Sequence, residues 1–329
     1  MRVRLLTTAP HAGGVSRHVA ELAAGLSDLG CDVGMQPGPA DIVHIHLHDT
    51  YDPRAFALAL GARSRGAPVI LTEHLPRTNA SDPTLLPGPR RRGASLAKGA
   101  FKRTEAILAR KIVTVCEGSR DFLQKRYGIG GSQVQTIPNG VAPQRDGGSA
   151  TPNGRLRVLA IGTLNVQKGH DVLIAAAARS RGEWRATIIG TGSARSALDE
   201  LAGKLERPQV ALAGWRDDAS DASLEADVLC LPSRWEACPY VVLDAMARGR
   251  CVVATNVDGL PEIVEHEVSG MLIPPDDASE LARVLDWLAA NPDAVRRMGI
   301  AARERVEKHF RLDRMIAATH DLYRETLNA

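Results

Sequence analysis

The chain has 329 residues, of which 44% are apolar and 24% are charged. This is the composition of an ordinary globular protein, and the length is sufficient for two α/β domains with complete cores. No apolar run approaches the roughly 18 residues of a membrane-spanning helix, and the strand-like N-terminus is unlike a signal peptide. The five cysteines are odd in number and scattered, which favours reduced thiols in a cytoplasmic protein.

The first part of the chain alternates strand-like and helix-like segments. An apolar run around Leu5 predicts a strand, and apolar residues then recur at helical spacing until Gly30, a helix stop. Regular alternation of this kind predicts a mainly parallel, doubly wound α/β sheet. The further strands predicted here are 41–47, 68–72, 111–116 and 134–137.

A stretch rich in Pro, Gly and Ser follows and lacks periodic apolar residues, so it predicts a linker. The alternation then restarts, with predicted strands at 156–162, 185–190, 209–213, 227–231 and 250–254. We therefore predict two Rossmann-like domains. They cover residues 1–142 and 156–305, with the linker at 143–155 and a final helical segment at 306–329.

The net charge of +3 conceals an imbalance, because residues 1–145 carry 19 Lys and Arg against 11 Asp and Glu. Residues 90–111 hold eight basic residues and one acid, and Leu96, Ala100 and Phe101 add an apolar stripe. Such basic amphipathic segments often lie on anionic membranes, so peripheral contact with the inner face of a membrane is one interpretation. The alternatives are a solvated helix packed on the first sheet and a surface for an anionic acceptor. One aromatic residue and no matching motif argue against nucleic acid.

Ligands of parallel sheets bind beyond the carboxyl ends of the strands, so the loops that follow strands are the candidate sites. Gly13 and Gly14 precede a helix whose free N–H groups favour phosphate, with a plain turn as the alternative. Lys168 either meets a phosphate, a contact of roughly 1.5–3 kcal/mol, or is a solvated lysine at a helix start. Gly190 and Gly192 either cradle a diphosphate or nucleoside or form a tight turn.

The loop and helix at 233–249 form the most informative segment. The segment follows an apolar strand, and Pro239 stands where a helix would begin. Glu236 lies in the mouth of the loop, and Asp244 lies in the first half of the helix. One acid can bind sugar hydroxyls and the other ribose hydroxyls, while the N–H groups between them can bind phosphate. For Asp244 the alternative is a solvated helix acid.

This segment resembles the donor-site signature of the GT-B glycosyltransferases of family 4, also called glycosyl transferases group 1. That signature has two glutamates separated by seven residues, and here Glu236 and Asp244 have this spacing. The resemblance covers nearly the whole chain and implies two Rossmann-like domains that face a central cleft. The other matching motifs, in the family's order, are Gly13-Gly14, Ile137-Pro138-Asn139-Gly140-Val141, Gln167-Lys168-Gly169, Gly190-Thr191-Gly192, Ala226-Asp227-Val228, Leu231-Pro232-Ser233, Asp258-Gly259-Leu260-Pro261-Glu262 and Ser269-Gly270.

The resemblance implies transfer of a sugar from a nucleotide-diphosphate sugar to an acceptor hydroxyl, with retention of configuration and without a metal or other cofactor. Lys168 would bind the diphosphate, Glu236 the transferred sugar and Asp244 the ribose. His74 would face the reacting centre, so His74 and Glu236 are the catalytic candidates. The remaining donor candidates are Gly13, Gly14, Thr163, Gly190, Gly192, Ala237, Cys238, Pro239 and Tyr240, and the acceptor-side candidates are His18 and His48.

The resemblance also implies that the final helix crosses back to the first domain, which would hold the acceptor. A lipid-linked sugar, a polysaccharide and a small natural product all stay open as acceptors. Three departures from the family pattern matter. Asp244 replaces a glutamate, Thr163 stands where an arginine is frequent, and the short connection from Asp32 to Asp41 indicates that a strand–helix segment is absent.

Several residues allow a second chemistry. His44, His46 and His48 alternate along one predicted strand and could bind Zn²⁺, although such histidines are common in this family without metal. Cys238 lacks an evident activating base, so a packing role is favoured over a nucleophilic one. Glu236 could act as a covalent nucleophile, but we favour front-face transfer, in which the leaving phosphate helps to deprotonate the acceptor.

Two other functions are compatible with the same fold. A nucleotide-sugar epimerase would convert the donor without an acceptor and would need an acid/base pair that we do not identify. A non-catalytic partner subunit would bind nucleotide weakly, and the joint presence of Lys168, Glu236 and His74 argues against it.

Overall fold

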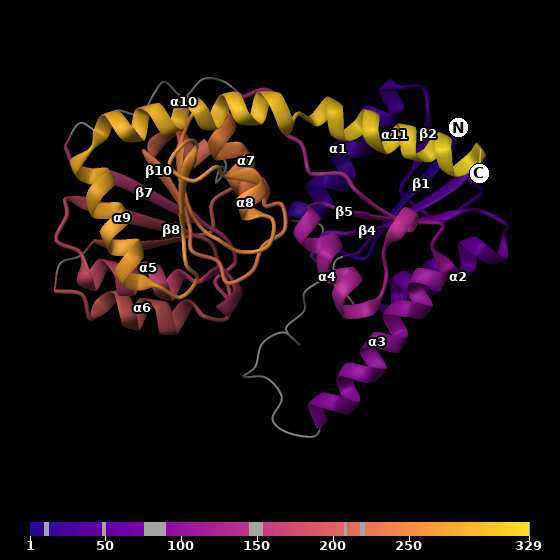
Figure 1. Ribbon diagram of the computed structural model, residues 1–329, viewed down its shortest axis with the longest axis horizontal. Helices are drawn as coiled ribbons and strands as arrows, with labels where there is room; N and C mark the ends of the chain where they lie inside the picture. The colour runs from indigo at the N-terminus through magenta and orange to yellow at the C-terminus, as the bar shows by residue number, and fades with distance from the viewer. Residues whose placement is uncertain are drawn as a thin grey trace. The chain divides into compact units, whose positions relative to one another are not determined.

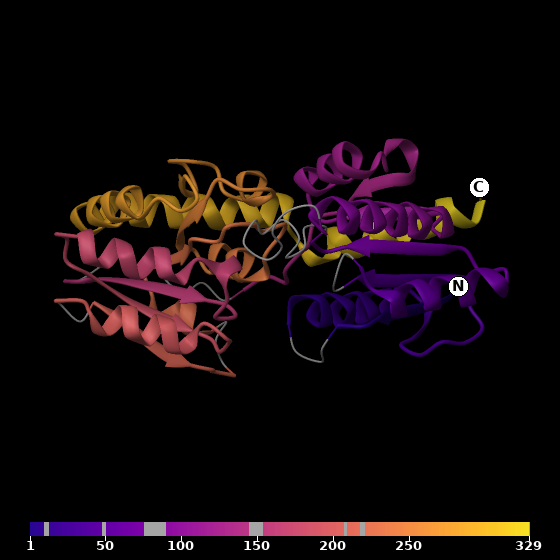
Figure 2. The same ribbon diagram turned by 90° about the horizontal axis from the view of Figure 1, so that it is seen from below.

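The computed structural model describes residues 1–9, 13–47, 51–75, 90–144, 154–206, 209–217 and 221–328, the side chains of 90–96 excepted. The chain divides into two compact units, and in each a sheet lies between helices (Figure 1, Figure 2). The first unit consists of Met1–Gly140 and Leu312–Ala329, and the second consists of Val141–Arg311.

The first unit contains a six-stranded parallel sheet in the order β2-β1-β3-β4-β5-β6. Helices α1 and α11 pack on one face, and α2, α3 and α4 contribute to the core on the other. Its elements are β1 (Arg2–Thr7), α1 (Gly14–Asp28), β2 (Asp32–Gly34), β3 (Ile42–Leu47), α2 (Pro53–Ser64), β4 (Val69–Glu73), α3 (Arg90–Leu108), β5 (Lys111–Thr114), α4 (Glu117–Tyr127), η2 (Gly131–Gln133), β6 (Val134–Thr136) and α11 (Leu312–Asn328).

The central strand β3 is buried along its whole length, as expected for a parallel strand covered on both faces. The three-residue strand β2 was not predicted. It pairs with β1 at the sheet edge, and the described chain then runs to β3 without a helix. The strand–helix segment expected to be absent would lie in the connection between β2 and β3, and the structure describes no further strand or helix there.

The second unit repeats the architecture with the sheet order β12-β11-β10-β7-β8-β9. Helices α5, α6 and α9 contribute to the core on one face, while α7 packs against α10. Strand β12 was not predicted. The elements are β7 (Leu156–Ile161), η3 (Val166–Lys168), α5 (His170–Arg179), β8 (Trp184–Ile189), α6 (Arg195–Gly203), β9 (Val210–Gly214), η4 (Asp221–Glu225), β10 (Val228–Leu231), α7 (Tyr240–Ala247), β11 (Cys251–Thr255), α8 (Leu260–Ile263), β12 (Gly270–Ile273), α9 (Ala278–Ala290) and α10 (Pro292–His309).

The C-terminal segment consists of two helices. Helix α10 continues to His309, past the predicted boundary at 306, and the chain passes between units at Arg311. Helix α11 belongs to the first unit, where it packs on α1; Gly25 allows this approach because a Cβ there would collide with the Ile316 side chain. Within the part of the chain that the structure describes, every helix is too short or too polar to cross a membrane.

Candidate functional site

The centre of the second unit's candidate site is an ion pair between Lys168 and Glu236. Lys168 ends η3, and Glu236 lies in the loop between β10 and α7. Lys168 Nζ donates to Glu236 Oε1 at 2.5 Å, and the two side chains are only 17% and 7% exposed. Ser233 Oγ donates to the same oxygen at 2.9 Å, and Asp258 Oδ2 accepts from the Glu236 amide at 3.2 Å. The structure thus joins two predicted donor residues 68 positions apart.

The glycines at 190 and 192 allow the loops after β7 and β8 to pack backbone against backbone. Gly190 has φ 151°, and a Cβ there would collide with the Gly162 carbonyl oxygen. A Cβ at Gly192 would collide with the Leu164 backbone. Leu164 N also donates to the Thr191 carbonyl at 2.9 Å. These glycines are therefore required by loop packing, whatever they contribute to a ligand.

Gly169 likewise allows close backbone packing, here between the loops that carry Lys168 and Glu236. Its φ is 63°, and a Cβ there would collide with the Pro232 carbonyl oxygen. The conformation places Lys168 beside the loop of Glu236. Thr163, which replaces a family arginine, is exposed after β7.

The loop after Glu236 leads directly into α7. The helix begins at Tyr240, one position after the predicted start, and Pro239 is its N-cap residue. Asp244 is 5% exposed, so the alternative of a solvated helix acid was wrong. The donor candidates Ala237 and Cys238 in the loop and Tyr240 at the start of α7 are buried too.

The first unit's candidate site is a cluster of three histidines. His18 lies on α1, His46 on β3 and His74 directly after β4. Their ligand nitrogens all lie within 4.8 Å of one another. His46 Nδ1 is 3.3 Å from His74 Nε2, and His18 Nδ1 is 3.0 Å from Asn139 Oδ1. Burial lowers the pKa of His18 to about 4 and that of His46 well below its usual value, so both rings are neutral at pH 7.

Strand alternation predicted that His44, His46 and His48 would share a face, but the structure brings a different set of histidines together. His44 and His46 share a face, with ring centroids 4.2 Å apart. However, His44 uses both ring nitrogens elsewhere, at 2.6 Å from Thr72 Oγ1 and 2.6 Å from Tyr323 Oη. His48 lies outside the described residues. The described histidines that come together are therefore 18, 46 and 74.

Gly13 and Gly14 belong to the first unit, whereas the other predicted donor residues belong to the second. Gly13 has φ 133° and caps α1, and its carbonyl accepts from Arg17 N at 3.1 Å. The residues just before it, 10–12, lie outside the described part of the chain.

Three polar residues around Glu236 and the histidines were missed by sequence reasoning. Ser233, Asp258 and Asn139 all occur within the motifs that carry the resemblance, yet no role was assigned to them. Their proximity to Glu236 and His18 in space is the signal that was missing, because it depends on how distant loops meet.

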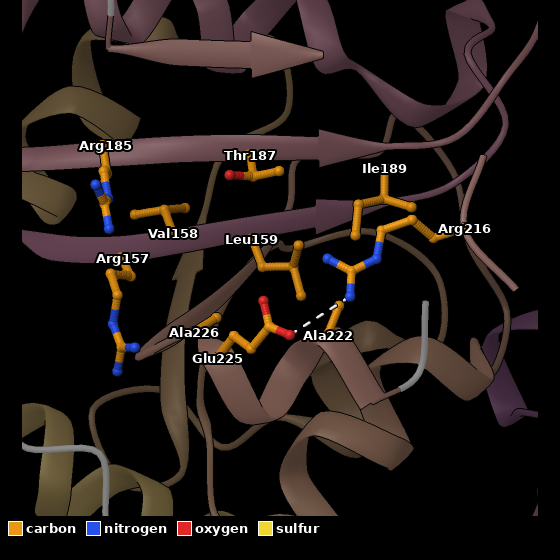
Figure 3. A pocket seen from close by; sticks show the side chains of 10 residues that line it. All are labelled: Arg157, Val158, Leu159, Arg185, Thr187, Ile189, Arg216, Ala222, Glu225 and Ala226. Atoms are coloured by element: carbon orange, nitrogen blue, oxygen red, sulfur yellow. Dashed lines mark hydrogen bonds and ion pairs between the residues drawn. The ribbon is translucent and has the colours of Figure 1, made fainter. Parts of the chain in front are cut away.

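A cavity of about 160 Å³ lies elsewhere in the second unit, between the sheet and η4 (Figure 3). Arg157 and Arg185 line it from the first halves of β7 and β8, and Arg216 pairs with Glu225 at 3.4 Å across it. Arg157 is held by the buried Asp227 at 2.7 Å. None of the predicted donor residues lines this cavity.

Solved structures of similar fold support this architecture. Sucrose-phosphate synthase from Thermosynechococcus elongatus superposes with a TM-score of 0.80 and 20% identity, covering 98% of each chain. The Anabaena protein Alr3699/HepE, in complex with UDP-glucose, superposes with a TM-score of 0.77 and 18% identity, covering 98% of this chain and 99% of the other. Both likenesses extend over the two units.

Sequence comparison identifies the family. The D-inositol 3-phosphate glycosyltransferase of Streptomyces bingchenggensis is 28% identical over 328 residues, which cover 91% of this chain and 70% of that protein. The family model described as Glycosyltransferase Family 4 matches residues 35–145. The model described as Glycosyl transferases group 1 matches residues 155–291. The chain therefore belongs to the GT-B glycosyltransferases of family 4, the glycosyl transferases group 1.

Proposed function

We propose that this glycosyltransferase moves a sugar from a nucleotide-diphosphate sugar to an acceptor hydroxyl, with retention of the anomeric configuration and without a metal. The observation that carries the proposal is the Lys168–Glu236 pair at the carboxyl ends of β7 and β10. Ligands of parallel α/β sheets bind at this edge. Anabaena Alr3699/HepE, which shares the fold, has been solved in complex with UDP-glucose.

The pair offers one binding partner to the diphosphate of such a donor and one to its sugar. Lys168 would exchange the Glu236 carboxylate for the diphosphate, and Glu236 would then accept hydrogen bonds from the sugar hydroxyls. Neither group is left buried and unpaired before the donor arrives, because each satisfies the other. Asp244 would bind the ribose, and the backbone of 190–192 would lie near the nucleotide.

For the transfer step we propose front-face attack. The acceptor oxygen bonds to the anomeric carbon while the bond from that carbon to the diphosphate oxygen breaks, and the leaving phosphate takes the acceptor proton. Glu236 Oε1 already accepts from Lys168 and Ser233, which favours its binding role over that of a covalent nucleophile. His74 would orient the acceptor hydroxyl, and undiminished turnover of His74→Ala would remove that role.

In the basic segment 90–111, fewer cations are available for contact with a membrane or an anionic acceptor than the composition indicates. Lys102 is buried, Arg103 Nε donates to the Tyr127 carbonyl at 3.0 Å, and Lys111 Nζ donates to the Ser132 carbonyl at 2.8 Å. These cations are therefore engaged within the unit. A peripheral contact would rest on the remaining cations and on Ile107, which is 77% exposed.

Thermal-shift titration of the pure protein with UDP, GDP, ADP and dTDP tests the donor site. A ligand that binds only the native state stabilises it by about 2.7 kcal/mol at a hundred times its Kd. We expect one nucleotide to raise the Tm and Lys168→Ala to weaken its binding roughly tenfold to a hundredfold, from the roughly 1.5–3 kcal/mol of a charged hydrogen bond.

Lys204→Ala is the matched control. Lys204 also pairs with a glutamate, Glu200, at 2.7 Å, but both side chains are exposed on or beside α6. The control should bind the nucleotide as the wild type does. If no nucleotide stabilises the wild type, the donor-site proposal is wrong.

A further inference from the structure

We infer that Arg234 is a positioning residue of the donor site, which holds the loop of Lys168 against the loop of Glu236. The inference rests on the proposed donor site. Arg234 lies between Ser233 and Glu236 in the loop after β10, and it reaches across to the segment that contains Lys168.

The guanidinium group forms hydrogen bonds to residues on both sides of Lys168 in the sequence. Arg234 Nη1 donates to the Val166 carbonyl at 2.6 Å and to Asp171 Oδ1 at 3.0 Å, and Nη2 donates to Asp171 Oδ2 at 2.7 Å. Val166 begins η3, and Asp171 lies in the first turn of α5. This planar two-bond fork fixes orientation as well as distance, which a lysine cannot do.

The main chain reinforces the same connection. Arg234 N donates to the Gln167 carbonyl at 2.7 Å, and Gln167 Nε2 donates to the Trp235 carbonyl at 3.1 Å. Gln167 precedes Lys168 and Trp235 precedes Glu236. These two bonds tie the loops together on the N-terminal side of Lys168, and the fork to Asp171 ties them on its C-terminal side.

Arg234 also contacts a third loop. Arg234 Nε is 2.8 Å from Asp276 Oδ1, in the loop that follows β12. Asp276 has φ 59°, a left-handed conformation that aspartate tolerates better than most residues. Arg234 therefore connects the loops after β7, β10 and β12, with Asp171 on one edge of the guanidinium and Asp276 on the other.

Arg234 is the most buried member of this network. Its side chain is 21% exposed, whereas those of Asp171 and Asp276 are 42% and 59% exposed. Burial raises the pKa of Asp171, but the hydrogen bonds and charge of Arg234 outweigh it, so the pKa lies below its usual value. Loss of the fork would let the Lys168 and Glu236 loops shift relative to each other. A displacement of about 1 Å between such groups costs on the order of a hundredfold in rate.

The test compares Arg234→Ala, Arg234→Lys and Asp171→Asn with the wild type. Its probe is whichever of UDP, GDP, ADP and dTDP stabilises the wild type. We expect Arg234→Ala to weaken nucleotide binding about tenfold or more and to lower kcat. Arg234→Lys should restore little, because one ammonium group cannot bridge Asp171 and Asp276, and Asp171→Asn should fall between.

Arg283→Ala is the matched control, because Arg283 makes the same two-bond fork with Glu280, at 2.8 and 2.6 Å, on the exposed face of α9. It should leave binding and turnover unchanged. The deciding variant is the double substitution Arg234→Ala with Lys168→Ala. If Arg234 acts through Lys168, the double variant binds nucleotide no more weakly than Lys168→Ala alone.

The outcomes separate this inference from the proposed function. Normal nucleotide binding and turnover by Arg234→Ala, or additive losses in the double variant, would overturn the positioning role and leave the donor site standing. Normal binding by Lys168→Ala, or no binding by the wild type, would overturn the donor site and this inference with it.

Discussion

Lys102, on α3, is buried against Glu73, the last residue of β4, and Glu73 is followed directly by His74. Lys102 Nζ also contacts Glu105 Oε2 at 2.7 Å, and all three side chains are at most 2% exposed. One cation thus lies between two carboxylates in the core of the first unit. The basic segment is anchored by this contact next to a catalytic candidate.

Lys102→Met should strongly destabilise the protein, because it leaves two carboxylates buried without their partner. Removing one partner of a buried ion pair costs about 3–5 kcal/mol. The free energy of unfolding from urea titration measures the loss. Lys125→Met removes an exposed pair with Asp121 and should cost about 0–1 kcal/mol; equal losses in both variants would contradict the buried role.

Glu105→Gln should become more stable relative to the wild type as the pH rises from about 4.3 to 7. Burial raises the pKa of Glu105 to about 7, opposed by Lys102 and assisted by Glu73. A raised carboxyl pKa means that the wild type loses stability as Glu105 ionises over this window, and glutamine cannot ionise. Parallel unfolding curves at pH 5 and pH 7.5 provide the measurement, and a constant difference would rule out the shift.

His44→Gln should have a lower free energy of unfolding than the wild type at neutral pH. The difference should shrink as the pH falls below 6.5. Burial lowers the pKa of His44 to about 3, with a contribution from His18. Because the folded state keeps this ring neutral, its stabilisation is complete above the unfolded pKa of about 6.5 and is lost towards the folded value, by up to about 1.4 kcal/mol per pH unit. Unfolding free energies at pH 7.5, 6 and 5 give the slope; a gap that widens on acidification would show the opposite sign.

Gly169→Ala should destabilise the second unit and weaken nucleotide binding. The left-handed conformation costs a non-glycine residue about 1–3 kcal/mol, and the new Cβ would also push against the Pro232 carbonyl. Gly203→Ala, in α6, meets open space and should be neutral or stabilise by about 0.4–1 kcal/mol. Calorimetry with and without nucleotide compares the two variants, and equal Tm values would refute the packing argument.

Turnover should survive removal of divalent metals. The proposed chemistry assigns the diphosphate to Lys168 and backbone N–H groups, so a chelated and dialysed enzyme should keep its kcat. The clustered imidazoles of His18, His46 and His74 in the first unit make zinc the metal to examine first, by elemental analysis of the same sample. Loss of activity that Zn²⁺ or Mg²⁺ restores would overturn the metal-free mechanism.

Most strands could be predicted from the sequence because a parallel strand buried on both faces reads as an apolar run, as 42–47 does. The missed strands were β2 and β12, which have three and four residues at sheet edges and leave too short a pattern. The break between α10 and α11 was missed for a different reason. Apolar residues recur at helical spacing on both sides of Phe310, so no local signal marks the place where the chain changes units.

The sequence by itself determined the α/β class, the two-unit organisation and the motifs that contain Lys168, Glu236 and His74. Only the tertiary structure decided which of their side chains meet. Parallel pairing of β7 with β10 brings Lys168 to Glu236, and the packing of α11 gives His44 a partner 279 residues away, which leaves His46 for His74. Strand periodicity places residues on a face, but contacts between loops and between distant helices depend on sheet order and register, which no local pattern contains.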